Sequence, residues 1–171
     1  PLMISLGQVM VKGTGFDGIV RRAVELGIGE VIPVSSCRCI PKISEYDINK
    51  KMDRWSRIAR EASKQCGRSR VPTVGPNATS VKEFCSAYQN AGLKLIFWEE
   101  EQSIKIKNLP HKSQFDSAAV LVGPEGGFSS DEVEISKKYG FQSVSLGPRL
   151  LRTETAPLAA ISIIQYVWGD L

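Results

Sequence analysis

The sequence contains a single histidine, His111, and this scarcity excludes most histidine-dependent chemistry. We expect this residue to lie in a loop. No serine or cysteine stands in a recognisable nucleophile motif, so Ser-His-Asp and Cys-His hydrolases are set aside. The cysteines form no pair of C-x-x-C clusters and have no companion histidines, so we expect reduced thiols and no metal site. They are Cys37, Cys39, Cys66 and Cys85.

Long hydrophobic runs are also missing. No segment reaches the roughly 18 apolar residues of a membrane span, and the start of the chain lacks the sections of a signal peptide. We therefore expect a cytoplasmic protein without membrane contact. A length of 171 residues with 42% hydrophobic content indicates one domain with a substantial core. The formal net charge of +4 mildly favours an acidic partner such as nucleic acid.

The dinucleotide and triphosphate fingerprints G-x-G-x-x-G and G-x-x-x-x-G-K-[ST] are absent. In their place stands "LVGPEGGFSSDEV", residues 121–133, where an apolar run ends in a glycine-rich turn that holds Glu125. Ser129 and Glu132 have the spacing of a capping box, which places this turn between a strand and a helix. Glu125 would repel phosphate but suits a cationic ligand, such as the sulfonium or ammonium of S-adenosylmethionine. A purely structural turn would explain the same residues.

Hydrophobic periodicity predicts alternating helices and strands. Helical spacing covers residues 16–24, 48–66, 81–91, about ten residues after Ser129, and the apolar stretch from Pro157 onward; strands are expected at 30–34, 93–98, 118–122 and 141–146. This alternation predicts an α/β fold with a mostly parallel sheet flanked by helices. Ligands bind such sheets beyond the carboxyl ends of the strands, here at "FWEE", "GPEGG" and "LGPRLLRTETA".

Five segments together resemble the RsmE family of 16S ribosomal RNA methyltransferases. They are "ELG" (25–27), "REASKQCGRSRVP" (60–72), "FWEE" (97–100), "LVGPEGGFSSDEV" (121–133) and "SLGPRLLRTETA" (145–156). The resemblance implies a SPOUT methyltransferase domain over residues 1–171, with a C-terminal deep trefoil knot and a homodimeric assembly. It also implies S-adenosylmethionine-dependent methylation of uridine N3 in 16S rRNA, either naked or within the small ribosomal subunit.

Two features of this expectation rest on the resemblance alone. The general rule that protein chains are unknotted predicts an ordinary doubly wound sheet, so the knot does not follow from periodicity. Members of the family usually carry an N-terminal β-barrel that helps to bind RNA, and we expect this barrel to be missing from the present sequence. The chain is then either a fragment or a natural truncation.

The matching motifs also indicate site residues. The cofactor would contact two residues after the first strand end, four in the glycine turn and four in the last motif: Trp98, Glu99, Gly123, Glu125, Gly126, Gly127, Leu146, Gly147, Leu150 and Leu151. Core packing would also explain Trp98, Leu150 and Leu151.

Two residues in "LLRTETA" are candidates for the chemistry. The planar guanidinium of Arg152 would stabilise negative charge on uracil. Glu154 could take the N3 proton, although a glutamate near a helix start also suits the helix dipole. Arg68, Arg70 and Arg149 are candidates for phosphate contacts, or they are solvated charges.

Two alternative functions use the same residues. A SPOUT relative could methylate a ribose 2′-hydroxyl instead of a base nitrogen. The chain could also be a non-catalytic, cofactor-binding RNA module, although the intact "LLRTETA" argues against a loss of activity.

Overall fold

A computed structural model describes residues 2–11, 13–38, 45–75, 79–110 and 115–171, with only the backbone described at 45 and 46. These residues form one parallel sheet of seven strands in the order β3-β2-β1-β6-β5-β7, with β4 pairing with β2. The strands are β1 (Met3–Val9), β2 (Glu30–Ser35), β3 (Thr73–Val74), β4 (Thr79–Ser80), β5 (Leu93–Phe97), β6 (Ser117–Val122) and β7 (Gln142–Val144). The predicted mostly parallel α/β fold is confirmed.

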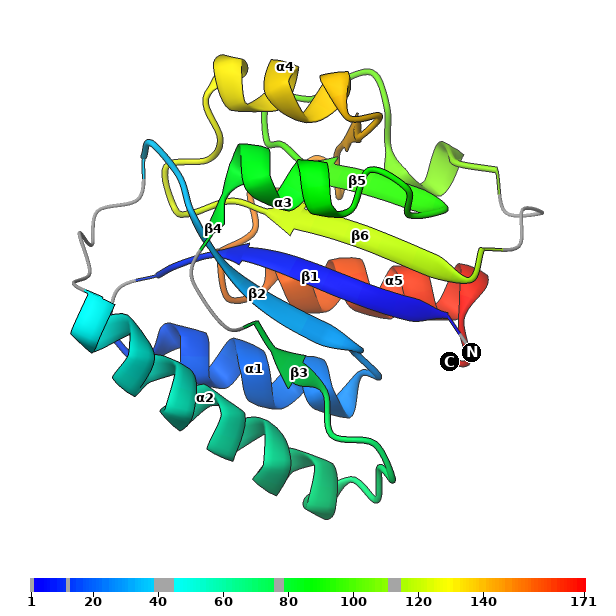
Figure 1. Ribbon diagram of the computed structural model, residues 1–171. Coiled ribbons are helices and arrows are strands. Elements are labelled where there is room, and N and C mark those ends of the chain that lie inside the picture. Colours follow the sequence, from blue (N-terminus) through cyan, green and yellow to red (C-terminus); the bar gives the residue numbers. More distant parts are fainter. Residues whose placement is uncertain (1, 12, 39–44, 76–78, 111–114) are drawn as a thin grey trace.

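Helices cover both faces of the sheet (Figure 1). One face carries α1 (Gly15–Glu25), α2 (Glu45–Gln65) and α5 (Ala156–Trp168), and the other carries α3 (Val81–Ala87) and α4 (Ser130–Lys138). A short 3-10 helix, η1 (Ile106–Asn108), lies between β5 and β6. The larger hydrophobic core lies beneath α1, α2 and α5, and the smaller one lies beneath α3 and α4.

The local signals for helix ends are confirmed. The predicted capping box of Ser129 and Glu132 forms at the start of α4, and Ser80 and Glu83, which have the same spacing, form one at the start of α3. Gly27 and Gly67 follow α1 and α2 with φ angles of 85° and 74°, a conformation that glycine adopts without steric cost. Pro157 lies in the first turn of α5. These features depend on neighbours in the sequence, which is why the sequence predicts them.

The central strand β1 was not predicted. Its sequence "MISLGQV" mixes apolar residues with Ser5, Gly7 and Gln8, although six of its seven residues are buried between β2 and β6. A Cβ at Gly7 would lie 2.8 Å from side-chain atoms of Leu121 and Phe84. Neighbouring strands and α3 therefore impose small residues that weaken the hydrophobic signal of this strand.

Further observations concern the predictions that were made from the amino-acid composition. Among the residues that the structure describes, no helix has both the length and the hydropathy needed to cross a membrane, and no cluster of His, Cys, Asp and Glu could hold a metal ion. Cys37 and Cys66 are exposed free thiols, whereas burial raises the pKa of the Cys85 thiol to about 12. His111 and Cys39 lie outside the described residues.

Candidate functional site

The carboxyl ends of β5, β6 and β7 meet at one edge of the sheet. Phe97, the last residue of β5, lies opposite Val122 of β6 on one side and Val144 of β7 on the other. The three segments that follow these strands enclose a pocket of about 560 Å³. This is the arrangement expected for ligand sites in open α/β sheets.

The pocket brings together most of the residues singled out from the sequence. Its lining includes Trp98, Glu99, Gly123, Glu125, Leu146, Gly147, Arg149, Leu150, Leu151, Arg152 and Glu154. Sequence reasoning did not select the other lining residues, Phe97, Val122, Pro124, Val144, Ser145, Pro148, Thr153 and Ala156. All of these lie within or directly beside the three motifs, so their position next to a strand end was the available signal.

Gly126 and Gly127 belong to the same turn but do not line the pocket. Gly127 has a φ of 65°, and its N–H donates to the carbonyl of Pro124 at 2.9 Å. A Cβ at this position would overlap the carboxylate of Glu99. The φ of Gly126 is not positive, and a Cβ added there would make only an ordinary contact, 3.7 Å from Cβ of Arg38. Of these two glycines, only Gly127 is therefore required by the shape of the turn.

Trp98 serves the core and the pocket together. Its half-buried ring packs against the core beneath α3 and α4, and it also lines the pocket. Its Nε1 donates to the carbonyl of Phe128 at 3.3 Å, and its backbone N–H donates to the carbonyl of Val144 at 3.2 Å. The residue thus fastens the start of the β5 loop to the glycine turn and to β7.

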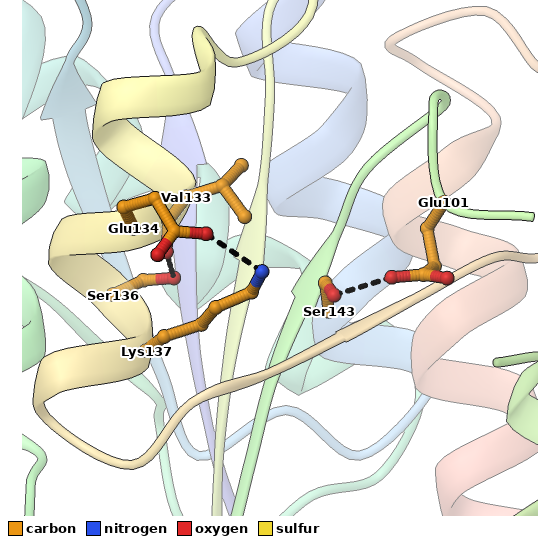
Figure 2. Close-up of polar contacts among 6 residues, drawn as sticks. All are labelled: Glu101, Val133, Glu134, Ser136, Lys137 and Ser143. Carbon is orange, nitrogen blue, oxygen red and sulfur yellow. Dashed lines mark hydrogen bonds and ion pairs between the residues drawn. The ribbon is translucent and has the colours of Figure 1, made fainter. Parts of the chain in front are cut away.

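A second anchor holds the loop after β5 in place. Ser143 of β7 donates a hydrogen bond to Glu101 (Figure 2). The other carboxylate oxygen of Glu101 accepts the backbone N–H groups of Ser103 and Ile104. The Ser143 bond, with the two backbone bonds and the charge of Lys137, outweighs the opposing effect of burial and lowers the pKa of Glu101. This carboxylate shapes the loop that carries Trp98 and Glu99.

The segment after β7 forms the exposed lip of the pocket. Gly147 has a φ of 127°, and Leu150 is 82% exposed. The carbonyl of Arg152 accepts the N–H groups of Thr155 at 2.8 Å and Ala156 at 2.9 Å, so the chain turns directly into α5. The Arg152 side chain is exposed, and no described residue forms a hydrogen bond or ion pair with its guanidinium. This guanidinium is available to a ligand.

Glu154 precedes α5 in the sequence, but its carboxylate lies against α1. A Cβ at Gly15, the first residue of α1, would lie only 2.8 Å from Oε1 of Glu154. The carboxylate therefore faces the N-terminus of α1, where the partial positive charge of the helix favours an anion. The absence of a side chain at Gly15 leaves room for it.

The pocket therefore combines apolar walls with charges of both signs. Phe97, Val122 and Val144 form part of its apolar lining. Three glutamates and two arginines also line it: Glu99, Glu125, Glu154, Arg149 and Arg152. Such a site suits a ligand with an apolar group and a positive charge, next to an anionic second ligand.

Comparisons with known proteins identify the class of protein to which this fold and this pocket belong. A family model described as an RNA methyltransferase domain matches residues 1–165. The ribosomal RNA small subunit methyltransferase E of Buchnera aphidicola is 35% identical over the whole chain, which covers 68% of that relative. The chain belongs to this family of RNA methyltransferases.

Two solved structures are also similar over the full chain. A methyltransferase of Legionella pneumophila in complex with its bound cofactor SAM has a TM-score of 0.91 at 35% identity, with 69% of its length covered. The ribosomal RNA small subunit methyltransferase E of Neisseria gonorrhoeae, bound to S-adenosyl methionine, has a TM-score of 0.86 at 38% identity, with 68% covered. The chain thus spans about two thirds of the length of these relatives.

Proposed function

We propose that this chain is the S-adenosylmethionine-dependent domain of a methyltransferase that modifies uridine N3 in 16S ribosomal RNA. The observation that carries the proposal is the pocket that forms where the three predicted strand ends meet. The names of the full-length relatives support a substrate in small-subunit rRNA, and their bound cofactor supports S-adenosylmethionine. Uridine N3 follows from the RsmE resemblance, and an rRNA substrate implies a cytoplasmic location.

The pocket fits the proposed cofactor in size and chemistry. Its volume of about 560 Å³ lies within the range of roughly 300–1,000 Å³ that small-molecule sites occupy. Leu146 and Leu151 provide apolar surface for the adenine ring, and Glu99 and Glu125 provide negative charge for the cationic end. Gly123 supplies backbone groups without an intervening side chain.

S-adenosylmethionine supplies an electrophilic methyl group, and the chain must prepare the uracil for attack on it. As N3 loses its proton, negative charge spreads onto the carbonyl oxygens of the base. We assign to Arg152, which lines the pocket at its lip, the donation of hydrogen bonds to these oxygens. An arginine stays protonated and does not remove the proton. Glu154 is the candidate base, because this residue lines the same pocket.

Calorimetric titration tests the cofactor assignment on this chain, because all of the lining lies within residues 97–156. We expect saturable, equimolar binding of S-adenosylmethionine and of its demethylated product. A folded chain that gives no heat with either ligand would refute the assignment.

Transfer of a labelled methyl group to unmethylated small ribosomal subunits tests the activity. A full-length relative such as the Bacillus subtilis enzyme is the positive control. Nucleoside analysis then separates 3-methyluridine from a 2′-O-methylated product. Cofactor binding without any transfer, under conditions in which the control is active, would favour the non-catalytic module.

Contacts to RNA phosphate groups are assigned to two exposed arginines. Arg149 at the lip and Arg70 before β3 are both exposed and suit contacts to phosphate groups. Arg68 differs, because its Nη1 donates to the carbonyls of Val24 at 3.0 Å and Ile28 at 2.7 Å. We therefore assign Arg68 to holding the end of α1, and Arg70 and Arg149 to RNA.

We also propose that the C-terminal segment forms the knot implied by the resemblance. Two sets of contacts support it, since β7 pairs with β5 on one side, and Ser145 then pairs with Lys105 of the β5–β6 connection on the other. Backbone hydrogen bonds join Ser145 to Ile104 and Ile106 at 2.8 and 3.1 Å. The chain then turns back to place α5 beside α1 and β1. The segment after β7 thus runs between β5 and the connection that leaves it.

A homodimer is expected from the outer face of α5 and the pocket lip. Tyr166 and Leu150 are 78% and 82% exposed, and burial of such side chains on a partner would be favourable. Light scattering at micromolar concentration should give twice the mass of the chain. A Tyr166→Glu variant should shift the protein toward monomer, and a wild-type monomer would contradict the proposal.

A further inference from the structure

Glu132 makes more contacts than its role in a capping box requires. Its carboxylate is buried, and Oε2 accepts the backbone N–H of Ser129 at 3.0 Å and its hydroxyl at 3.2 Å. It also binds the segment after β2, which lies 95 residues away in the sequence. Oε1 accepts the N–H of Cys37 at 3.0 Å, and Oε2 accepts the hydroxyl of Ser36 at 3.1 Å and the thiol of Cys37 at 3.3 Å.

The same segment also reaches the glycine turn of the pocket. Nη1 of Arg38 donates to the carbonyl of Gly126 at 2.8 Å. Figure 1 shows the segment after β2 (light blue) beside the yellow turn that leads into α4. The turn is thus held from outside by Arg38, while Trp98 holds it from the side of the β5 loop through the carbonyl of Phe128.

These contacts favour an ionised Glu132. Burial opposes the charge, but the backbone N–H groups of Ser129 and Cys37, together with the Ser36 hydroxyl, outweigh it and lower the pKa of this carboxyl. Because the folded-state pKa is lowered, this stabilisation is present above the unfolded pKa and is lost as the pH falls through the folded one.

We propose that Glu132 is a positioning residue that clamps the Ser36–Arg38 segment against α4, and that Arg38 thereby holds the Gly123–Gly127 turn in its cofactor-binding shape. Neither Glu132 nor Arg38 lines the pocket, so both act through the turn. The effect on cofactor affinity rests on the proposed function, whereas the clamp itself does not.

The chain offers a matched control in the capping box of α3. There, Oε2 of Glu83 accepts all three bonds, from the hydroxyl of Thr79 and from the backbone and hydroxyl of Ser80. A glutamine at this position keeps an oxygen there and turns its amide group to solvent. Glu132 uses both oxygens, so a glutamine must place its NH₂ group against a donor, and either the cap or the Cys37 bond is lost.

Amide hydrogen exchange in the ligand-free protein tests the clamp. Glu132→Gln should speed exchange of the Cys37 and Gly127 amides at least about tenfold, because the hydrogen-bonded conformation that protects these amides is populated less in the variant. Glu83→Gln should leave both amides at wild-type rates. Arg38→Met, which leaves the α4 cap intact, should speed exchange at Gly127 but not at Cys37. Wild-type rates in both Glu132→Gln and Arg38→Met would overturn the proposal, as would equal acceleration in Glu83→Gln.

Cofactor titration then connects the clamp to the pocket. Glu132→Gln and Arg38→Met should each weaken S-adenosylmethionine binding by about tenfold, and the double variant should lose little more, because both changes release one turn. Multiplied losses in the double variant, or equal weakening by Glu83→Gln, would overturn the positioning role. If the wild-type chain binds no cofactor, the proposed function fails, and the exchange data still decide whether the clamp exists.

Discussion

Replacement of Arg152 by alanine should lower methyl-transfer turnover by about 10²- to 10³-fold, the usual cost of removing one preorganised donor from a site of developing charge. Cofactor affinity should stay close to the wild-type value, because the loss falls on the transition state. The free energy of unfolding should also change little, since the Arg152 side chain is exposed and forms no hydrogen bond or ion pair with a described residue. Single-turnover rates on small ribosomal subunits, with calorimetry for the cofactor, measure the two effects separately.

Lysine at position 152 distinguishes chemistry from simple charge attraction. An ammonium group cannot reproduce the planar fork of a guanidinium, so Arg152→Lys should recover little turnover. If Arg152 only contacted phosphate, lysine would restore the rate, and alanine would instead weaken RNA binding in a salt-dependent way. Full rescue by lysine, or near-normal turnover with alanine, would remove Arg152 from the chemistry.

Gly127→Ala should destabilise the glycine turn and weaken cofactor binding. The φ of 65° alone costs a residue with a side chain about 1–2 kcal/mol, and the new Cβ also collides with the carboxylate of Glu99. Relief of this collision moves either Glu99 or the turn, and both form walls of the pocket. Affinity for S-adenosylmethionine should therefore fall by at least about tenfold, or ~1.4 kcal/mol.

Gly126→Ala is the control for this prediction, because it adds the same methyl group to the neighbouring residue. Its φ is not positive, and the added Cβ meets only the Arg38 side chain at ordinary distance. Denaturant unfolding and calorimetry should place this variant close to wild type. Equal losses in the two variants would show that the turn is sensitive to any side chain, and that the φ of Gly127 does not matter specifically.

The sequence by itself determined the helices, most strands of the sheet, and the edge where the pocket lies. The capping boxes at Ser80 and Ser129 and the stops at Gly27 and Gly67 follow from contacts within about four residues, which a linear pattern records. The motif resemblance likewise selected residues that line one pocket. The sequence did not predict β1, because contacts with neighbouring elements require small and polar residues in this strand, and these residues weaken its hydrophobic pattern.

Tertiary structure alone decided what several of these residues do. It showed that the backbone conformation at Gly127 requires glycine, whereas that at Gly126 does not. It also showed that Arg68 donates to two backbone carbonyls, while Arg70 stays exposed. It also joined Glu132, which the sequence marked only as a helix cap, to Cys37 across 95 residues. Local rules carry no information about such pairs, because a hydrogen bond between distant segments exists only once the sheet has brought them together.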